Sequence, residues 1–271
     1  MSSCFKRLKN WILYPRQYRN FIEHLEVSRL SSSAFADNAL RHEIYTTYRD
    51  VFGHGGDNEW GEYVKCQACS MVYDIETIHG INAYVQLSVL PAHPPSSRCC
   101  GAPLEYFYTD SALEQKFKLL LDKPDALFFV LKDDQSGAIV GLIAGYLGRA
   151  GTAWNENIKD KLTLQNGDHP LGAFGDQRVV YIDEIGILRT YRCGRVPFLR
   201  LFSSLTKAAN DAGGAMNILF WTRIDSNLYR LTQHLPHKIV VRDLASPPRV
   251  VIAIPFQSTY RKVRCLNVLY T

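Results

Sequence analysis

The sequence lacks any long apolar run. No stretch of about 18 apolar residues occurs in the 271-residue chain, so no transmembrane helix is expected. Lys6, Arg7 and Lys9 precede the apolar segment WILYP, which is too short for a secretory signal peptide. The excess of positive over negative charge is also small. A net charge of +5 is well below that of a polycationic nucleic-acid binder. We therefore expect a cytoplasmic protein without a membrane partner, and nucleic acid is not an expected partner.

Cysteine is sparse outside one cluster. Three of the seven cysteines stand alone, at Cys4, Cys193 and Cys265. The other four, Cys66, Cys69, Cys99 and Cys100, lie within 35 residues of one another. In a chain without a secretion signal, such a cluster favours metal binding over disulfides.

The cluster resembles a zinc ribbon or a pair of rubredoxin-like knuckles. A CxxC pair at Cys66 is followed about 30 residues later by RCCGAPL, although a regular second knuckle would need cysteine where Ser97 stands. The expected ligands are Cys66, Cys69 and Cys100, with Cys99, His93 or His79, in that order, as the fourth. The resemblance implies a structural Zn²⁺ site, and buried thiols without metal are the alternative.

Periodicity and turn signals indicate alternating helices and strands. Helices are expected at 15–30, 39–51, from Asp110 or Ser111 through 121, at 197–212, and from a cap at Asp225 or Ser226 to His234. Strands are expected at 126–131, 138–147, 179–188, 216–222, 238–242 and 249–256. The segment 148–177 is polar and predicted to be a long loop with one short helix near 155–162. Hairpins at both ends of this order exclude a doubly wound sheet.

The most informative stretch runs from Val179 to Thr222. It reads as a strand, a basic glycine turn (YRCGRV, Tyr191–Val196), an amphipathic helix and a second strand. The free N–H groups and the dipole at a helix start favour anions. This order therefore predicts a site for a phosphate-bearing cofactor between two strands.

These residues resemble the GNAT superfamily of acyl-CoA-dependent N-acyltransferases. YIDEIGIL, the turn RTYRCGRV, NILFWT and TRIDSNLYRLTQHL carry the resemblance, which covers about 110–257 with helix 38–51 as its N-terminal part. It implies an α/β fold of the α+β type, with a mixed, mostly antiparallel twisted sheet flanked by helices. That sheet would be splayed between the two strands that flank the CoA-binding turn.

The resemblance also implies the cofactor contacts. Backbone amides of the turn would hold the CoA pyrophosphate, the backbone of Ile187 and Leu188 would pair with pantetheine, and Asn227 would lie close to the cofactor. The residues expected at the turn are Arg192, Cys193, Gly194, Arg195 and Val196. Tyr191 stands where Gln or Arg is usual and Val196 where Gly or Ala is usual, so the turn departs from the family pattern.

Three residues are candidates for catalysis. Asp183 and Glu184 are adjacent on a strand, so their side chains are expected to point to opposite faces, with only one in the cleft. The resemblance favours Glu184 as the general base, with Asp183 as the other candidate. His234 stands where the family often has a tyrosine that protonates the leaving thiolate, so it is a candidate general acid. A salt-bridged carboxylate and a helix-end histidine are the structural alternatives.

The sequence thus predicts an acetyl-CoA-dependent N-acetyltransferase. It would transfer an acetyl group to a primary amine of a small molecule or protein, by direct attack in a ternary complex. The expected parts are an N-terminal helical part (1–61), a zinc-ribbon-like insertion (62–108) and the acyl-CoA-binding core (109–271). The alternative is a catalytically inactive relative in which the zinc module binds protein or nucleic acid. The acceptor is left open, as is a homodimer formed through the basic N-terminus.

Overall fold

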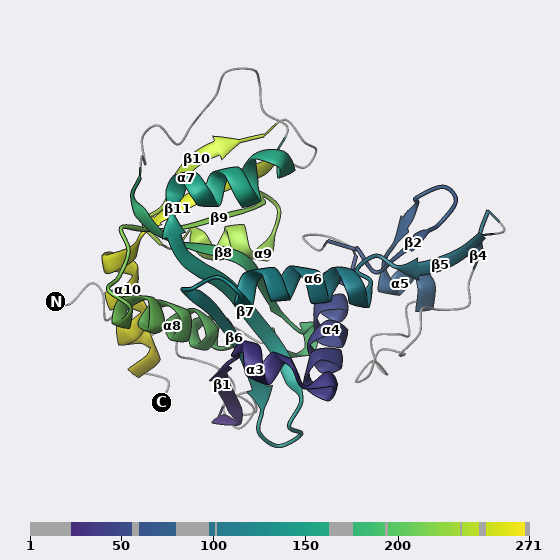
Figure 1. Ribbon diagram of the computed structural model, residues 1–271, viewed down its shortest axis with the longest axis horizontal. Coiled ribbons are helices and arrows are strands. Elements are labelled where there is room, and N and C mark those ends of the chain that lie inside the picture. Colours follow the sequence, from purple (N-terminus) through teal and green to yellow (C-terminus); the bar gives the residue numbers. More distant parts are fainter. Residues whose placement is uncertain are drawn as a thin grey trace.

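A computed structural model describes most of the chain. It describes residues 23–55, 60–79, 98–100, 102–162, 176–192, 195–233, 235–243 and 248–268. Within these residues a seven-stranded sheet forms the body, and a separate four-stranded sheet lies beside it (Figure 1). No helix of this described part is long and apolar enough to cross a membrane.

The seven strands of the main sheet are mostly antiparallel. In spatial order they are β1 (Leu25–Arg29), β6 (Ala126–Asp133), β7 (Ile139–Arg149), β8 (Arg178–Ile187), β9 (Asn217–Arg223), β11 (Arg249–Pro255) and β10 (Lys238–Arg242). β8 and β9 pair in parallel, whereas the other neighbours pair antiparallel. The mixed, mostly antiparallel sheet expected from the sequence is confirmed.

Helices cover both faces of this sheet and bury two apolar layers (Figure 1). One face carries α3 (Ser32–Phe35), α4 (Asn38–Gly53), α6 (Asp110–Leu121) and α7 (Ala150–Ala153). The other face carries α8 (Val196–Asp211) and α10 (Phe256–Val268). A short helix, α9 (Asn227–Thr232), follows β9. Alternation along the strands explains the two layers, because successive side chains point to opposite faces.

Local signals place the helix starts. Asp37 caps α4 by accepting from the Leu40 N–H at 3.0 Å, as the sequence allowed. Thr109 caps α6, which begins at Asp110 as expected, and Ser226 caps α9. The predicted helices at these places are confirmed to within a few residues, and so are the predicted strands.

The structure differs from the predicted elements in two places. The helix predicted at 15–30 is contradicted over its second half, because Leu25–Arg29 forms strand β1 and pairs antiparallel with β6. Pairing with a strand about 100 residues away overrides the local helical pattern. The sequence analysis also did not identify α10, whose Phe256 and Val263 are buried against α8.

The long connection after β7 is partly helical. α7 is followed by a π-helical turn at Trp154–Ile158 and a 3-10 turn at Lys159–Lys161, so the helix expected near 155–162 is present in irregular form. Trp154 and Ile158 are buried in the layer of α4 and α6.

The second sheet belongs to the segment that holds the cysteine cluster, here called the cysteine module (residues 63–79 and 98–106 of the described chain). It contains β2 (Val64–Cys66), β3 (Val72–Tyr73), α5 (Ile75–His79), β4 (Arg98–Cys99) and β5 (Ala102–Tyr106), in the strand order β3-β2-β5-β4. Its small apolar cluster includes Tyr63, Ile75 and Tyr106. Figure 1 shows the module beside the ends of α4 and α6. It therefore lies against the body rather than within the main sheet.

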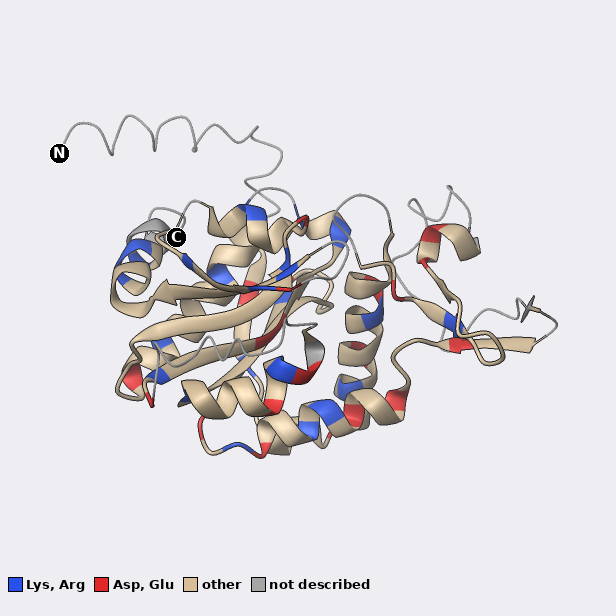
Figure 2. Cartoon of the chain, turned by 90° about the horizontal axis from the view of Figure 1, so that it is seen from above, with Lys and Arg blue, Asp and Glu red and all other residues tan. Residues whose placement is uncertain are grey.

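Charge on the described surface is mixed. Figure 2 shows Lys and Arg interspersed with Asp and Glu along the helices. Several of these charges form ion pairs one helical turn apart, such as Lys118 with Glu114 and Lys207 with Asp211. This pattern agrees with the modest net charge of the whole chain.

Candidate functional site

A cleft opens where β8 and β9 part. The two strands pair from Val179–Asn217 to Tyr181–Leu219, and no further pairing follows although both strands continue. The splay expected between these strands is therefore present. A cavity of about 700 Å³ lies there, lined by Ile182 to Ile187 of β8, by Phe220 to Thr222 of β9, and by residues of α4 and α9.

A β-bulge in β8 shapes the floor of the cleft. Ala144 of β7 pairs with Glu184 and Gly145 pairs with Ile182, so Asp183 is an extra residue between two regular pairs. Gly145 is required here, since a Cβ on it would lie 2.1 Å from the Tyr181 carbonyl oxygen. The bulge shifts the alternation of side chains by one residue.

The bulge corrects the expectation that Asp183 and Glu184 face opposite ways. Ile182 packs in the layer under α8, and strict alternation would place Glu184 in that layer too. Instead, both carboxylates line the cleft and both contact the ammonium of Lys116, Asp183 at 3.3 Å. Two carboxylates and one ammonium leave one net negative charge at the floor of the cleft.

Lys116 and Tyr48 hold this pair of carboxylates. Burial alone would lower the pKa of Lys116, but the charges of Glu184 and Asp183 raise it well above its usual value, so Lys116 stays an ammonium. Tyr48 is fully buried and donates a hydrogen bond to Glu184. Burial is the main cause that raises the pKa of Tyr48, so its hydroxyl keeps its proton.

A second acidic group lies on the wall of the cleft. Glu62 accepts a hydrogen bond from the hydroxyl of Tyr108, whose ring packs edge-on against Tyr48. Burial raises the pKa of Glu62, and the bond from Tyr108 and the charge of Arg249 offset this only in part. Glu62 and Tyr108 flank the cysteine module in sequence, so the two ends of the module contribute to the cleft wall.

Aromatic rings and arginines complete the wall. Trp60 and Trp221 pack edge to face with ring centroids 5.7 Å apart, and both line the cleft. Arg249 lies over the ring of Trp221 at 5.6 Å, and Arg223 lies over that of Trp60 at 5.4 Å. This end of the cleft can therefore contact both apolar and charged parts of a ligand.

The start of α8 lies at the other end of the cleft. Among the described residues no side chain caps its first amides, unlike those of α4, α6 and α9. Arg195 is its N-cap residue and lines the cleft, and Pro197 stands in its first turn. Val196 is buried, so any ligand contact would come from its backbone. An uncapped start beside an arginine favours an anion.

Arg192 lines the cleft and donates hydrogen bonds to two backbone carbonyls in its wall. Its Nε donates to the Ile187 carbonyl at 2.6 Å and its Nη2 to the Val51 carbonyl at 3.3 Å. These two bonds join the end of β8 to α4. The phosphate contact of Arg192 stays a prediction. Asn227 also lines the cleft, from the first position of α9.

The backbone groups of Ile187 and Leu188, both expected to pair with pantetheine, lie in different surroundings. The Leu188 N–H donates to the Val140 carbonyl at 2.8 Å, and its own carbonyl accepts from Tyr191 at 2.9 Å. A pantetheine contact at Leu188 therefore does not fit this geometry, because β8 has already turned away there. Backbone groups alternate sides along a strand, so those of Ile185 and Ile187 face the gap between β8 and β9.

Three expected site residues lie outside the described residues: Cys193, Gly194 and His234. Their predicted roles, two at the CoA turn and one as general acid, stay predictions.

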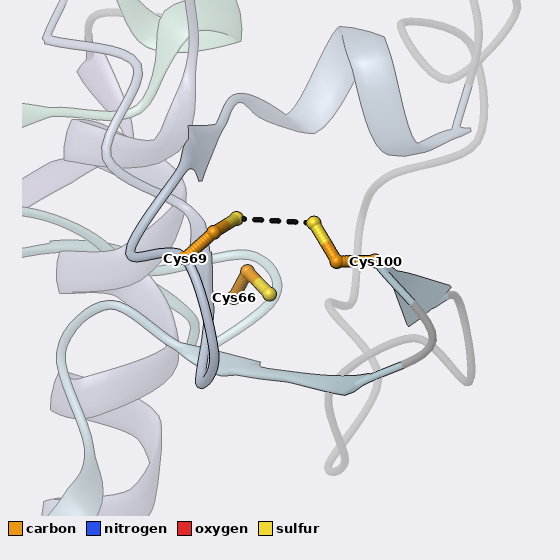
Figure 3. Close-up of side chains that lie close together, drawn as sticks. All are labelled: Cys66, Cys69 and Cys100. Carbon is orange, nitrogen blue, oxygen red and sulfur yellow. Dashed lines mark hydrogen bonds between the residues drawn. The ribbon is translucent and has the colours of Figure 1, made fainter.

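The sulfurs of the cysteine module converge. Cys66, Cys69 and Cys100 place their sulfurs within 4.8 Å of one another, and Figure 3 shows them pointing toward a common centre. The Cys69 and Cys100 sulfurs are 3.4 Å apart, and none of the three cysteines forms a disulfide bond within the described residues. The backbone of Cys99 ends β4, whereas its side chain, that of His79 and all of His93 lie outside the described part.

A buried histidine joins the cysteine module to α4. The ring of His54 is 6% exposed and contacts Asp50 of α4 through Nε2 at 3.0 Å and Glu76 of α5 through Nδ1 at 2.7 Å. The Nδ1 contact with Glu76 is a hydrogen bond, and the Nε2 contact with Asp50 is an ion pair when the ring is protonated. Burial would lower the pKa of His54, but the two carboxylates outweigh it and raise the pKa above its usual value. His54 therefore keeps its second proton to a higher pH than an unperturbed histidine does.

This raised pKa predicts a loss of stability as pH rises. The bonds of His54 contribute fully below its unfolded pKa of about 6.5, and the contribution disappears as pH rises through the raised folded pKa. One charge-assisted bond is worth about 2 kcal/mol, so the melting temperature of the wild type should fall by roughly 4–8 °C more than that of His54→Gln as pH rises from below about 6.5 into the alkaline range. Scanning calorimetry of both proteins across this range measures the difference. Equal pH slopes in the two proteins would contradict the prediction.

Sequence reasoning missed Lys116, Glu62, Tyr108 and the two cleft tryptophans. A signal was present for Lys116, which occupies the apolar stripe Leu113, Phe117 and Leu120 of its helix, where a charge needs a buried partner. Glu62 and Trp60 lie in a loop, and their position in the cleft depends on where the cysteine module is placed.

Comparisons with known proteins give matches in structure alone. No family model matches the sequence, and no curated protein matches it. Solved structures do match. Nourseothricin acetyltransferase is 10% identical, with 86% of this chain and 98% of that chain covered, at a TM-score of 0.41. Ribosomal-protein-S5-alanine acetyltransferase from Vibrio fischeri is 9% identical, with coverage of 86% and 94%, at a TM-score of 0.39.

A further match is Arabidopsis thaliana NAA60 in complex with acetyl-CoA. It is 14% identical, with 52% of this chain and 83% of that chain covered, at a TM-score of 0.37. Two of the three are named acetyltransferases, and the third is in complex with acetyl-CoA. At these TM-scores the similarity is loose, and the fold of this chain rests on its own strand order and register.

Proposed function

We propose that the protein is an acyl-CoA-dependent N-acyltransferase that transfers an acetyl group from acetyl-CoA to a primary amine. The amine, on a small molecule or a protein, would attack the thioester directly in a ternary complex. The observation that carries the proposal is the cleft between the splayed strands β8 and β9, with two carboxylates at its floor and an uncapped helix start at its end. The resemblance of the sequence to the GNAT superfamily supports the same assignment.

The donor end of the cleft suits a CoA molecule. The first amides of α8 and the guanidinium of Arg195 provide donors and positive charge for a pyrophosphate. The backbone of Ile185 and the N–H of Ile187 face the gap and offer a strand edge to an extended, amide-bearing arm, whereas the Ile187 carbonyl already accepts from Arg192. When bound, acetyl-CoA supplies the activated acyl carbonyl.

The acid–base chemistry would fall to the carboxylates. An amine enters the cleft as an ammonium and is attracted by the net negative charge of Asp183, Glu184 and Lys116. Glu184 takes the proton directly or through one water, and Lys116 and Tyr48 hold it in place. The neutral amine then attacks the acyl carbonyl, the C–S bond breaks, and the nitrogen gives up its second proton to solvent as the amide forms. A general acid protonates the leaving thiolate. His234 is the candidate acid.

Zinc binding by the cysteine module is the finer part of the proposal. Tetrahedral zinc with Zn–S bonds of about 2.3 Å separates its sulfurs by about 3.8 Å. The 3.4 Å between the sulfurs of Cys69 and Cys100 is near this value and far above a disulfide bond of about 2.05 Å. The three thiols thus fit zinc as three of four ligands, with Cys99, His93 or His79 as the fourth. The site would be structural, because a small loop-rich module gains order from such a clip.

Calorimetric titration with acetyl-CoA tests the donor. We expect saturable micromolar binding to the wild type and none to Gly194→Asp, because a carboxylate at the turn would repel the pyrophosphate. Glu105→Gln, a change at a residue that bonds to Lys65 and Gln67 within the cysteine module, serves as the control that should bind normally. An amine screen with mass spectrometry of the products then identifies the acceptor.

A folded, metal-loaded protein that binds no acetyl-CoA would refute the proposal. In that case the alternative, an inactive relative that binds through its cysteine module, would account better for the departures at Tyr191 and Val196. Equal affinity of Gly194→Asp and the wild type would remove the turn from the donor site.

A further inference from the structure

Glu76 belongs to the cysteine module, and its carboxylate contacts residues in two other parts of the protein. Glu76 lies in the first turn of α5. Its Oε1 is 2.7 Å from Nδ1 of His54 and 3.3 Å from Nη1 of Arg189, and its Oε2 accepts from the Gly55 N–H at 2.9 Å. One side chain thus joins the module, the end of α4 and the segment after β8.

These contacts form a compact, charge-balanced cluster. His54 is buried and Glu76 is 17% exposed, whereas Arg189 is 44% exposed. Asp50 faces the other ring nitrogen of His54, so two carboxylates meet the imidazole of His54 and one guanidinium. Removing the charge of Glu76 would take one of two carboxylates from His54 and break the ion pair with Arg189. Glu76 is therefore not an ordinary surface carboxylate.

Arg189 lies on the segment that leads into α8. It begins the 3-10 turn Arg189–Tyr191, directly after β8 and shortly before the proposed pyrophosphate turn. Arg192, at the end of this segment, is bonded to Val51 of α4. The segment is thus anchored at its start by the module and at its end by α4.

The module cannot shift on α4 without breaking close contacts. A Cβ on Gly55 would lie 1.8 Å from the Asp74 carboxylate, and one on Gly53 would lie 3.0 Å from the Ile75 side chain. Asp74 and Ile75 lead into α5. The position of Glu76 is therefore set by packing, and a movement of α5 would pull on Arg189.

We propose that Glu76 is a positioning residue for the acyl-CoA donor, because it fixes the segment that enters α8 through Arg189 and so couples the cysteine module to donor binding. This inference rests on the proposed function of the cleft. Coupling between two sites is reciprocal, so the donor must stabilise the module by the same factor as the module strengthens donor binding.

Calorimetric titration of Glu76→Gln with acetyl-CoA tests the coupling. We expect a dissociation constant about fivefold or more above that of the wild type. Glu105→Gln is the matched control, since Glu105 lies in the same module but bonds to Lys65 and Gln67 within it. It should bind acetyl-CoA as the wild type does.

Arg189→Gln separates positioning from general damage to the module. It leaves the bonds of Glu76 to His54 and Gly55 in place, and it should weaken acetyl-CoA binding by the same factor as Glu76→Gln. The double variant should show no further loss, because both changes break one interaction. Additive losses would instead indicate a direct contact between Arg189 and the donor and would overturn the proposal.

Hydrogen exchange gives a readout that a purely structural role would not change. In the wild type, acetyl-CoA should slow exchange of the α5 amides, and in Glu76→Gln this protection should vanish. If the wild type binds no acetyl-CoA, the proposed function itself fails. If the wild type binds, and Glu76→Gln matches Glu105→Gln in affinity and in exchange protection, the proposed function stands and this inference is wrong.

Discussion

Replacement of Glu184 by Gln is expected to lower kcat about 10²- to 10⁴-fold with little change in the affinity for acetyl-CoA. Gln has the shape of Glu but cannot take a proton from the amine. Lys116 would keep Asp183 as a partner, so the floor of the cleft should stay assembled. Steady-state kinetics at neutral pH with the amine identified by the screen measures the loss.

The pH profile separates a lost base from a damaged site. Without its base the variant depends on amine that has already lost its proton, so its rate should recover as pH approaches the pKa of an alkyl amine, about 10. Asp183→Asn is the matched control, because it removes a neighbouring carboxylate that also contacts Lys116. We expect a smaller loss there. A Glu184→Gln enzyme within a few-fold of the wild type at neutral pH would exclude Glu184 as the base.

Most helices and strands of the body could be predicted because their sequence signals are local. For the helices, these signals include capping side chains such as Asp37 and Ser226 and the apolar stripe of α8. The order of hairpins and helices then limits the topologies, and the splay of β8 and β9 follows from the resemblance. β1 could not be predicted in this way, because its pairing with β6 is a contact between distant segments.

The chemistry of the cleft depends on such distant contacts even more. The bulge at Asp183 arises from the register between β7 and β8 and from Gly145, about 40 residues earlier in the chain. Without the bulge, Glu184 would face the layer under α8. The identity of the two carboxylates could be predicted from the sequence, but their shared direction and their contact with Lys116 could not.

The role of the cysteine module also emerges from its position. The cysteine spacing predicts a metal clip, and the three converging sulfurs agree with it. The spacing says nothing about Glu62 and Tyr108, which lie where the chain enters and leaves the module and reach the cleft. The module therefore contributes to the proposed active site from both of its ends.

The second large effect is expected from Cys66→Ser, which should remove the proposed zinc ion and lower the stability of the cysteine module. Cys66 is 1% exposed, so Cys66→Ser would remove a buried ligand that no other side chain can replace from solvent. Structural zinc contributes about 10–16 kcal/mol in small zinc modules, far more than the module's small apolar cluster could supply alone. We expect about one zinc per wild-type chain by elemental analysis, almost none in Cys66→Ser, and a separate low-temperature unfolding step in the variant.

The controls for this experiment also identify the fourth ligand. Cys4→Ser, outside the cluster, should keep its zinc, whereas one of Cys99→Ser, His93→Asn and His79→Asn should bind zinc distinctly more weakly than the other two.

Intact-mass measurement after thiol labelling distinguishes metal from oxidation, because a Cys69–Cys100 disulfide would leave two thiols fewer to label once zinc is removed. Freshly purified wild-type protein without zinc would refute the metal site. Because Glu62 and Tyr108 depend on the module, zinc loss should lower acceptor turnover as well as stability.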